Sequence, residues 1–489
     1  MTHGSKSPSD AKSASASAAP LPRIIQGGMG VGVSDWRLAN AVARLGELGV
    51  VSGTAIDAVL ARRLQLGDPG GHMRRAMARF PIAGVAEAAL ERYFLPAGLA
   101  PGQPFAGLSM HTQRVSLARE QFTILAAFVE VYLAREGHQG PVGINLLTKI
   151  QMPNLALLYG AMLAKVDFVL MGAGIPRELP TVLDALANHE PAQLRFDVED
   201  AAPGQVELLR FDPGAHWAGA APAVRRPRFL AIVASNTLAT MLAKKAARRV
   251  DGLVVEGPTA GGHNAPPRDR EVSPTTGEPL YGARDVVDLE QVRALGVPFW
   301  VGGGAGWPDR LAEALRAGAA GIQVGTLFAY CDESGIAEPL RRSVLEGVVR
   351  GAVRVRTDGR ASPTGFPFKV VSWDDDPAAG VSRKRVCDLG YLRNAYRRGD
   401  GTLGYRCASE PEDQFVAKGG APEETPDRKC LCNGLLSTIG LGQRREDATV
   451  EPPLLTSGDD VARLADFLHG RTHYSAAEAV RWLRGGSAA

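Results

Sequence analysis

The sequence predicts an α/β fold of the TIM-barrel class, a (β/α)8 barrel with a helical insertion and a C-terminal cap region. Three observations predict it: eight short apolar segments follow one another, they are rich in Val, Ile and Leu with little polar alternation, and most precede a segment with helical periodicity. Strands covered on both faces have this composition, and alternating strands and helices form a parallel sheet. A count of eight favours a closed barrel, and the alternative is a doubly wound open sheet.

The predicted strands and helices alternate from residue 23 onward. Short apolar runs are typical of buried strands, whereas apolar residues three and four positions apart indicate amphipathic helices. The strands are predicted at 24–28, 49–53, 142–147, 167–172, 229–235, 252–256, 298–303 and 321–328. Helices are predicted after five of these strands, at 35–45, 178–187, 237–247, 289–295 and 309–317.

Two insertions separate predicted strands of the barrel. Residues 56–140 lie between the second and third strands and are mostly helical in pattern, with an amphipathic stretch at 117–135. Residues 191–228 are punctuated by Pro and Gly, which interrupt regular structure, so we expect an irregular excursion there.

The C-terminal part departs most from a minimal barrel. Residues 365–453 are rich in Gly, Asp and Arg and hold four of the five cysteines, and we expect a cap; a lid, a dimer contact and a partner surface are open alternatives for its role. Helix-like stretches at 459–468 and 476–484 are expected to pack back on the barrel. The predicted division is a disordered tail at 1–20, a ligand-binding barrel at 21–360, and the cap with closing helices at 361–489.

Composition and charge exclude several classes of protein. The 489 residues contain 55 Lys and Arg against 52 Asp and Glu, a net charge of +3, so neither nucleic acid nor a membrane surface is an expected partner. Five cysteines argue against a disulfide scaffold and for a reducing compartment. No apolar run reaches the ~18 residues of a membrane span, and the N-terminal residues lack the apolar core of a secretory signal. A cytoplasmic location is therefore expected.

The loop after the sixth predicted strand, Gly261-Gly262-His263, is the most informative motif. Two glycines let the backbone approach a ligand closely, because they carry no Cβ and accept positive φ. A histidine just beyond the C-terminal end of a parallel strand lies where α/β enzymes keep their chemistry. The alternative is a glycine-rich surface turn with an incidental histidine. Glu256, at the end of the same strand, is expected to cap the strand or brace the loop.

A second set of glycines follows the last two predicted strands. Gly302, Gly303 and Gly304 follow the seventh strand, and Gly325 and Thr326 follow the eighth. In barrels, these two loops form a phosphate site from backbone N–H groups and a helix N-terminus. The alternative is a pair of simple glycine turns.

Other strand ends suit a broad, flat ligand. The first strand ends in Gln26-Gly27-Gly28-Met29-Gly30, where the glycines let an aromatic group lie on the backbone and Met29 offers a polarizable sulfur. Asn145 ends the third strand, and its amide can both donate and accept hydrogen bonds. Gly172 ends the fourth. Together with the phosphate loops, these positions indicate a ligand shaped like FMN, although other phosphate-bearing ligands remain open.

In order along residues 23–345, these motifs resemble the nitronate monooxygenase (2-nitropropane dioxygenase) family of FMN-dependent TIM barrels. The pieces that carry the resemblance are Ile25 to Gly30, Gly143-Ile144-Asn145-Leu146, Ala260 to His263, the glycines at 302–304, and Gln323-Val324-Gly325-Thr326-Leu327-Phe328. The resemblance implies FMN as cofactor and His263 as the catalytic residue. The predicted cofactor-binding residues are Gln26, Gly27, Gly28, Met29, Asn145, Gly172, Gly262, Gly302, Gly303, Gly304, Gly325 and Thr326.

The resemblance implies an enzyme that oxidises alkyl nitronates with O2 to a carbonyl compound and nitrite. Some flavin enoyl reductases share the same motifs, so an NAD(P)H-dependent enoyl or quinone reductase is the first alternative. A barrel that binds a phosphorylated metabolite without redox chemistry is the second. His263 would act as a general base toward a neutral nitroalkane, or in protonated form would pair with a nitronate. A homodimer is an open expectation.

Other features of the chain depart from the family pattern or carry no motif. The compact members have no counterpart of residues 365–453, and the loop at 264–284 is long and rich in Pro and Arg, so the substrate stays open. No metal site is predicted: the insert's cysteines form no CxxC pair and are expected to be packed residues, as is Cys331. Histidines without a motif are expected at the surface or in loops. The cysteines are Cys387, Cys407, Cys430 and Cys432, and the histidines are His72, His111, His138 and His216.

Overall fold

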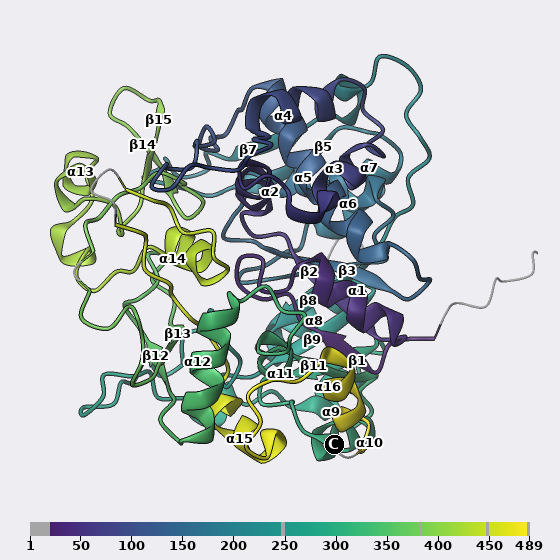
Figure 1. Ribbon diagram of the computed structural model, residues 1–489, viewed down its shortest axis with the longest axis vertical. Helices are drawn as coiled ribbons and strands as arrows, with labels where there is room; N and C mark the ends of the chain where they lie inside the picture. Colours follow the sequence, from purple (N-terminus) through teal and green to yellow (C-terminus); the bar gives the residue numbers. More distant parts are fainter. Residues whose placement is uncertain (1–19, 246–249, 382, 446–448, 487–489) are drawn as a thin grey trace, which may run out of the picture.

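The computed structural model describes residues 20–245, 250–381, 383–445 and 449–486, so the predicted tail at 1–20 lies almost wholly outside the described residues. Eight parallel strands form a closed barrel in the order β1-β11-β10-β9-β8-β4-β3-β2 (Figure 1). The predicted fold class is therefore confirmed. The strands are β1 (Ile24–Gln26), β2 (Leu48–Ser52), β3 (Val142–Leu147), β4 (Phe168–Gly172), β8 (Arg228–Val233), β9 (Gly252–Glu256), β10 (Phe299–Gly302) and β11 (Gly321–Val324).

Large apolar side chains fill the barrel, which is a packed core and not a pore. Trp300 is fully buried among side chains from five other strands, including Leu48, Phe168 and Leu230. Its indole Nε1 donates to the carbonyl of Pro22 at 2.8 Å, which ties the chain before β1 to the barrel interior. The filled interior leaves the C-terminal ends of the strands as the face available to a ligand.

Helices surround the barrel and connect its strands. The N-cap of α1 is Asp35, whose carboxylate accepts from the amides of Arg37 and Leu38 and so satisfies two of the free N–H groups at the helix start. The helices are α1 (Trp36–Arg44), α6 (Asn154–Leu163), α7 (Leu179–Ala187), α8 (Asn236–Thr240), α9 (Leu289–Arg293), α10 (Pro308–Arg316), α11 (Thr326–Ala329) and α12 (Glu338–Val349).

Two predicted boundaries on this ring are wrong. The eighth strand was expected to run to residue 328, but β11 ends at Val324 because Gly325 takes a right-handed helical conformation and its carbonyl accepts from the amides of Phe328 and Ala329. The helix expected at 237–247 ends as an α-helix at Thr240, and a π-helical turn follows at Met241–Lys245. The rest of that prediction lies outside the described residues.

The first insertion is helical, as predicted, and forms a layer above the barrel (Figure 1). Its long helix α5 packs against α1, α2 and α6, and most of its side chains are buried. No helix among the described residues is both long and apolar enough to cross a membrane. The helices are α2 (Ile56–Gln65), α3 (His72–Met77), α4 (Val85–Tyr93) and α5 (Leu117–Arg135).

The second insertion is more regular than predicted. Strands β5 (Ala192–Phe196) and β7 (Glu207–Phe211) pair antiparallel, so the expectation of an irregular excursion is wrong for this part. Apolar and exposed residues alternate along β5, with Leu194 and Phe196 buried, which is the period of a strand with one face on the core. The short strand β6 (Val198–Glu199) leaves this hairpin and pairs with β14 of the C-terminal part.

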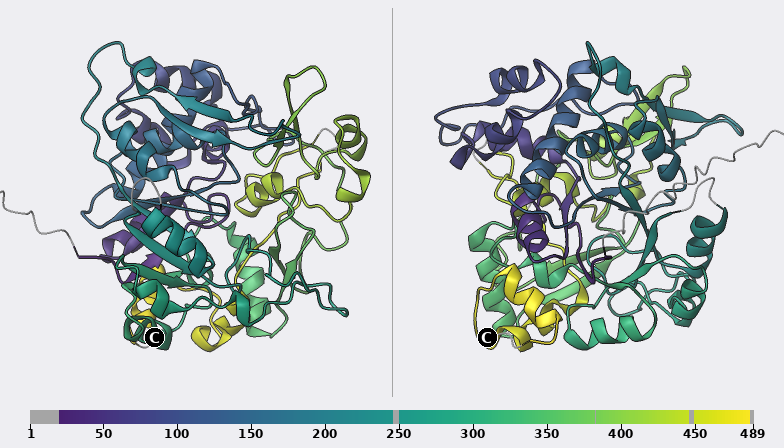
Figure 2. Two further views of the ribbon diagram at one scale, coloured as in Figure 1. Left: turned by 180° about the vertical axis from the view of Figure 1, so that it is seen from behind. Right: turned by 90° about the vertical axis from the view of Figure 1, so that its right-hand side faces the viewer.

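The C-terminal part forms small sheets and helices beside the barrel (Figure 1) and then returns to it. Its last helix contacts α1, α10 and α11, and Figure 2 shows the closing helices against the barrel from two further sides, as predicted. The elements are β12 (Arg354–Asp358), β13 (Phe368–Ser372), β14 (Asn394–Arg397), β15 (Leu403–Arg406), α13 (Glu412–Ala417), α14 (Leu431–Thr438), α15 (Leu464–Leu468) and α16 (Ala476–Leu483).

Candidate functional site

A cavity of about 1540 Å³, counting its open mouth, lies at the C-terminal ends of the barrel strands. Barrel loops form one wall, and residues 431–435 and 456–460 of the C-terminal part contribute to the other. The cavity brings together predicted site residues from six different strand ends. Those that line it are Gly27, Gly28, Met29, Asn145, Gly172, Gly262, His263, Gly303, Gly304, Gly325 and Thr326.

Two predicted cofactor-binding residues do not line this cavity. The side chain of Gln26 donates to the carbonyls of Gly27 and Val50, at 2.5 and 3.2 Å, and accepts from the amide of Val50 at 3.0 Å. It therefore fastens β1 to β2. Gly302 ends β10, and its carbonyl accepts from the amide of Gly257 at 3.2 Å. Both residues hold the loops that form the cavity wall.

The loop after β10 leaves backbone donors free. Gly303 and Gly304 have positive φ angles of 89° and 62°, which side chains other than glycine rarely accept. A Cβ on Gly303 would lie 3.0 Å from the Thr259 hydroxyl. Within the described chain, the amides of Gly303, Gly304 and Gly325 have no hydrogen-bond acceptor. Free amides at converging loops suit a phosphate group.

Thr326, which was also predicted at the phosphate, already has hydrogen-bond partners within the protein. Its hydroxyl accepts from the amide of Gly458 at 3.1 Å and is hydrogen-bonded to the carboxyl group of Asp460. Burial raises the pKa of Asp460, which lines the same cavity. Since a carboxylate repels a phosphate, the three glycine amides fit a phosphate better than Thr326 does.

Two further lining residues, Asn145 and Gln323, carry unpaired side-chain amide groups. Asn145 packs directly on Gly28, where a Cβ would come within 2.2 Å of the Asn145 Cβ. The Asn145 amide has no hydrogen bond to any described residue, and neither does the buried Oε1 of Gln323. These two amides can therefore contact the polar edge of a bound ring. Gln323 belongs to a motif noted in the sequence but was not predicted as a contact.

His263 is held by a segment of the C-terminal part, residues 362–369, which we call the strap. His263 Nε2 lies 2.7 Å from Ser362 Oγ, which is 2.8 Å from Thr364 Oγ1. The imidazole ring meets the Phe368 ring edge to face at 4.9 Å. Backbone bonds join the same two segments: the amide of Asn264 donates to Pro367, and that of Lys369 donates to Gly262. The strap therefore fixes both the loop and the ring.

Burial controls the charge of His263. Burial lowers the pKa of His263 to about 3, and the nearby positive charge of Lys149 acts in the same direction. The imidazole is therefore neutral at neutral pH. Without a ligand His263 is therefore not protonated, and its ring is a weak base.

Glu256 faces the cavity without the bracing contacts expected of it. Its carboxyl group has no hydrogen bond to the described residues, and burial raises its pKa to about 7. The expectation that it caps the strand or braces the loop is therefore wrong. A carboxyl group with this pKa gains and loses a proton near neutral pH.

Several lining residues could not be found by motif. Tyr391, Leu435 and Ser457 reach the cavity from the C-terminal part, and Ser362 and Phe368 reach His263 from the strap. Their sequence surroundings contain no spacing typical of a site. Only the prediction that residues 365–453 form a cap indicated that this region would meet the barrel face.

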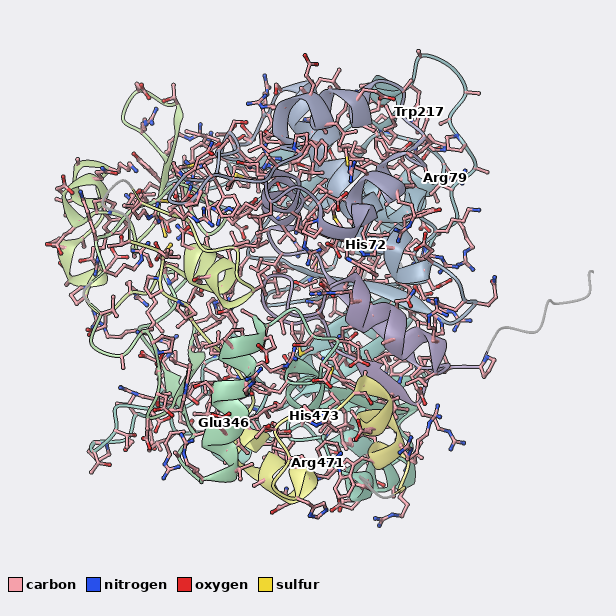
Figure 3. The ribbon with its side chains drawn as sticks, in the orientation of Figure 1. His72, Arg79, Trp217, Glu346, Arg471 and His473 are labelled. Atoms are coloured by element: carbon pink, nitrogen blue, oxygen red, sulfur yellow. The ribbon has the colours of Figure 1, made fainter. Side chains whose placement is uncertain are left out.

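Two of the four histidines without a motif are buried rather than at the surface, although one of them, His111, lies in a loop as expected. His111 is 3% exposed, and its Nε2 lies 3.0 Å from Asp57. His216 is also buried, 3.0 Å from Glu120. His72 lies on α3, at the labelled position in Figure 3, and its ring contacts Trp36. The carboxylates of Asp57 and Glu120 explain the burial of His111 and His216, because buried polar side chains normally have a partner.

Asp57 is the centre of a buried polar cluster behind the cavity. Burial alone would raise the pKa of Asp57, but the guanidinium of Arg119 and hydrogen bonds from His111 and Tyr391 hold it far below its usual range. The Arg119 and Tyr391 bonds are each 2.5 Å long. Tyr391, which belongs to the C-terminal part and lines the cavity, is thus hydrogen-bonded to the helical insertion through Asp57.

The four cysteines of the insert line one small cavity, and Cys432 also borders the main one. Burial raises the pKa of Cys387 to about 11 and that of Cys407 to about 12, so both are thiols at neutral pH. Cys331 is fully buried, as predicted. In the part of the chain that the structure describes, no group of three or more His, Cys, Asp or Glu is arranged to hold a metal ion.

Comparison with known families relates the second half of the barrel to flavin enzymes. Residues 218–362 match the model of the nitronate monooxygenase family. Nitronate monooxygenase of Pseudomonas aeruginosa is 29% identical over 206 residues, 42% of this chain and 51% of that protein. An octahydroindene-carboxyl-CoA dehydrogenase of Mycobacterium tuberculosis is 31% identical over 117 residues, 24% of this chain and 30% of that protein. The matches thus span about a third to a half of these curated relatives.

Solved structures with low sequence identity also resemble this chain. A nitroalkane oxidase from Streptomyces ansochromogenes is 16% identical with a TM-score of 0.46, and the alignment covers 95% of each chain. FabK from Thermotoga maritima is 17% identical with a TM-score of 0.40, over 74% of this chain and 73% of that one. The family match at 218–362 contains His263 and the glycines at 302–304 and 325, whereas Asn145 and Gly172 precede it.

Proposed function

We propose that this chain, whose residues 218–362 match the nitronate monooxygenase family, is an FMN-dependent monooxygenase that oxidises alkyl nitronates with O2 to a carbonyl compound and nitrite. One observation carries the proposal: a single cavity joins free backbone amides, a surface lined by glycines and a half-buried, neutral histidine. These are the groups needed to hold a phosphate, a planar ring and a small substrate beside it.

The residues present fit FMN. In this proposal the phosphate binds to the amides of Gly303, Gly304 and Gly325, and the ring lies on the Gly27–Met29 loop, with Asn145 and Gln323 at its polar edge. The unpaired amide groups at these positions support the assignment. When bound, FMN supplies the acceptor for electrons from the substrate carbanion, and the protein's part is to bind, orient and exclude water.

The charge state of His263 favours a nitronate over a neutral nitroalkane. A nitroalkane must lose a proton from carbon, and an imidazole with a pKa of about 3 is a poor base for that step. A nitronate is already deprotonated, so His263 has only to donate a hydrogen bond from its neutral ring to a nitronate oxygen. Ser362, 2.7 Å from Nε2, holds the ring for that contact.

The first test of the proposal uses His263→Asn in FMN-loaded protein. We expect the wild type to release nitrite from propyl-2-nitronate in air. The variant should keep its FMN but lose about 10- to 100-fold in kcat/KM, because this is the typical effect of losing one hydrogen bond to a charged group. Nitrite assay and flavin absorbance measure the two quantities. Full activity in the flavin-loaded variant would contradict the role of His263.

An NAD(P)H-dependent enoyl or quinone reductase is the second candidate. The 31% identity to a dehydrogenase of a carboxyl-CoA substrate favours it, because that substrate is an acyl thioester rather than a nitro compound. The two functions separate in anaerobic mixing of FMN-loaded protein. Bleaching of the flavin by NADH or NADPH supports the reductase, and bleaching by the nitronate supports the monooxygenase.

A further inference from the structure

Lys149 carries a buried ammonium group without an anionic partner. It lies in the loop between β3 and α6, among residues that follow the barrel strand on the cavity side. Within the described residues, Lys149 Nζ is buried and has no hydrogen-bond acceptor, and no carboxylate forms an ion pair with it. The ammonium group lies over the ring of Phe366, whose centroid is 3.0 Å from Nζ.

Lys149 lies next to the cavity that His263 lines, although Lys149 itself is not one of the lining residues. The side chains of Leu147 and Ile150, on either side of Lys149, line the main cavity. The positive charge of Lys149 acts on the imidazole of His263. The strap covers both groups, because Phe366 lies over Lys149 while Ser362 and Phe368 contact His263.

The energetics of this ammonium point to a missing anion. Burying a cation without a counter-charge is unfavourable, and buried charges in proteins are normally paired. Burial accordingly lowers the pKa of Lys149 to about 7. His263 cannot pair with an anion by charge, since it is neutral. A substrate anion beside His263 would therefore meet one cation, Lys149, and would stabilise its protonated form.

We infer that Lys149 binds the anionic group of the substrate, a planar group with two charge-sharing oxygens such as a nitronate or a carboxylate. In this arrangement the ammonium binds one oxygen, and the neutral His263 donates a hydrogen bond to the same group. The nitronate form of this inference rests on the proposed function. The anion site itself rests on the burial, the missing partner and the shared strap.

The flavin ring is the other source of a negative charge for Lys149. In the barrel order, β3 lies four strands from β10, so Lys149 is across the barrel from Gly303 and Gly304, which are proposed to hold the phosphate, whereas the ring is proposed to reach Asn145 on β3 itself. Lys149 is also covered by the same strap as His263. The shared strap favours the substrate as the source of the anion, and the FMN affinity of the Lys149 variant tests the flavin ring as the other source.

The test measures binding of isobutyrate, a carboxylate with the shape of propyl-2-nitronate that does not react, to FMN-loaded protein by calorimetry. Isobutyramide is the neutral counterpart. We expect the wild type to bind isobutyrate at least tenfold more tightly than the amide, and Lys149→Met to lose about 10- to 100-fold in isobutyrate affinity only. Lys149→Arg should retain part of the affinity. Lys418→Met, which removes a lysine paired with Glu410 outside the cavity lining, should match the wild type.

Three outcomes would overturn the inference. The first is that the wild type binds isobutyrate and isobutyramide equally well. The second is that Lys149→Met binds isobutyrate as tightly as the wild type does. The third is that Lys149→Met loses FMN affinity tenfold while its isobutyrate affinity is unchanged, which would show that the ammonium group binds the flavin. If isobutyrate binding depends on Lys149 but no nitronate is turned over, the anion site stands and the proposed function is wrong. Circular dichroism checks that each variant is folded.

Discussion

At the scale of single residues, the hydrogen bond to the substrate and the positive charge beside it are proposed to come from two side chains, His263 and Lys149, although one protonated histidine could supply both. The sequence left open whether His263 acts as a base or as a cation. Burial under the strap makes its ring neutral, and the positive charge that acts on it belongs to Lys149, on another loop. His263 therefore provides a neutral hydrogen-bonding group, and Lys149 provides the positive charge. A motif centred on His263 cannot reveal this division, because Lys149 is 114 positions away in the sequence.

Isobutyrate affinity should depend on pH through Lys149. Only the protonated ammonium pairs with a carboxylate, and the pKa of Lys149 in the free protein is about 7. Affinity should be constant below pH 7 and fall as pH rises above it, approaching tenfold per pH unit. His263 does not titrate in this range. Calorimetry of FMN-loaded protein between pH 6 and 9 measures the profile.

Glu256 requires a control in this experiment. Its pKa is also about 7, and its negative charge above that pH would weaken binding of an anion to the same cavity. Glu256→Gln removes this contribution and should keep the decline caused by Lys149. A flat profile in Glu256→Gln would show that Lys149 is not the titrating group. Lys149→Met should be weak at every pH.

At the scale of elements, the ends of the barrel strands were the part of the site most accessible to prediction. Parallel strands bring their C-terminal ends to one face, so Gly27, Asn145 and His263 could be grouped without coordinates. Gln26 was misleading, because a polar residue at a strand end can bind the neighbouring strand, as it does at Val50.

The strap and the C-terminal wall could not be predicted. Ser362 and Phe368 meet His263 across about a hundred residues, and nothing local marks them as partners. The pairing of β5 and β7 was missed for another reason: the Pro and Gly residues around it outweighed a clear alternation of apolar residues in Ala192–Phe196. Contacts between distant segments depend on tertiary packing, which local patterns do not contain.

The Asp57 cluster should be essential for joining the helical insertion to the cavity wall. In Asp57→Asn the guanidinium of Arg119 stays buried without its anion, so we expect a loss of about 3–5 kcal/mol in the free energy of unfolding. Tyr391→Phe removes one hydrogen bond to a charged group and should cost about 1.5–3 kcal/mol. Urea denaturation compares both with wild type. Equal stabilities would show that the cluster contributes nothing to the fold.

At the scale of the whole molecule, the cavity is shared between the barrel and the C-terminal part. Gly262 donates to the hydroxyl of Thr456, and Asp459 donates to the carbonyl of Thr259. The β6–β14 pairing connects the two parts at a second place. A ligand in the cavity therefore contacts both parts and should stabilise them together.

FMN binding should raise the melting temperature of the whole chain. FMN at a hundred times its Kd adds about 2.7 kcal/mol to the stability of the folded state, if the unfolded chain does not bind it. Gly303→Ala should abolish most of this gain, because a Cβ there would lie 3.0 Å from the Thr259 hydroxyl and would force the loop after β10 to shift. Gly296→Ala is the matched control, with φ of 68° and open space around it.

Calorimetric melting with and without FMN separates the two glycine variants. Both should melt somewhat lower than wild type without FMN, since each forces alanine into a left-handed conformation. Only Gly296→Ala should regain the full increase on adding FMN. Equal increases in the two variants would show that the loop after β10 does not hold the cofactor.

The contact of residues 456–460 with the loop that carries His263 has a consequence for how the protein is made. During synthesis, the eight barrel strands are complete once residue 324 has left the ribosome, but the cavity still lacks a wall. Domains generally begin to fold while translation continues. A nascent barrel thus presents an open, partly apolar mouth for the time needed to add more than a hundred further residues. If the chain binds FMN as proposed, the complete site for it would exist only after the C-terminal part has been added, and chaperones could bind the open mouth of the barrel before then.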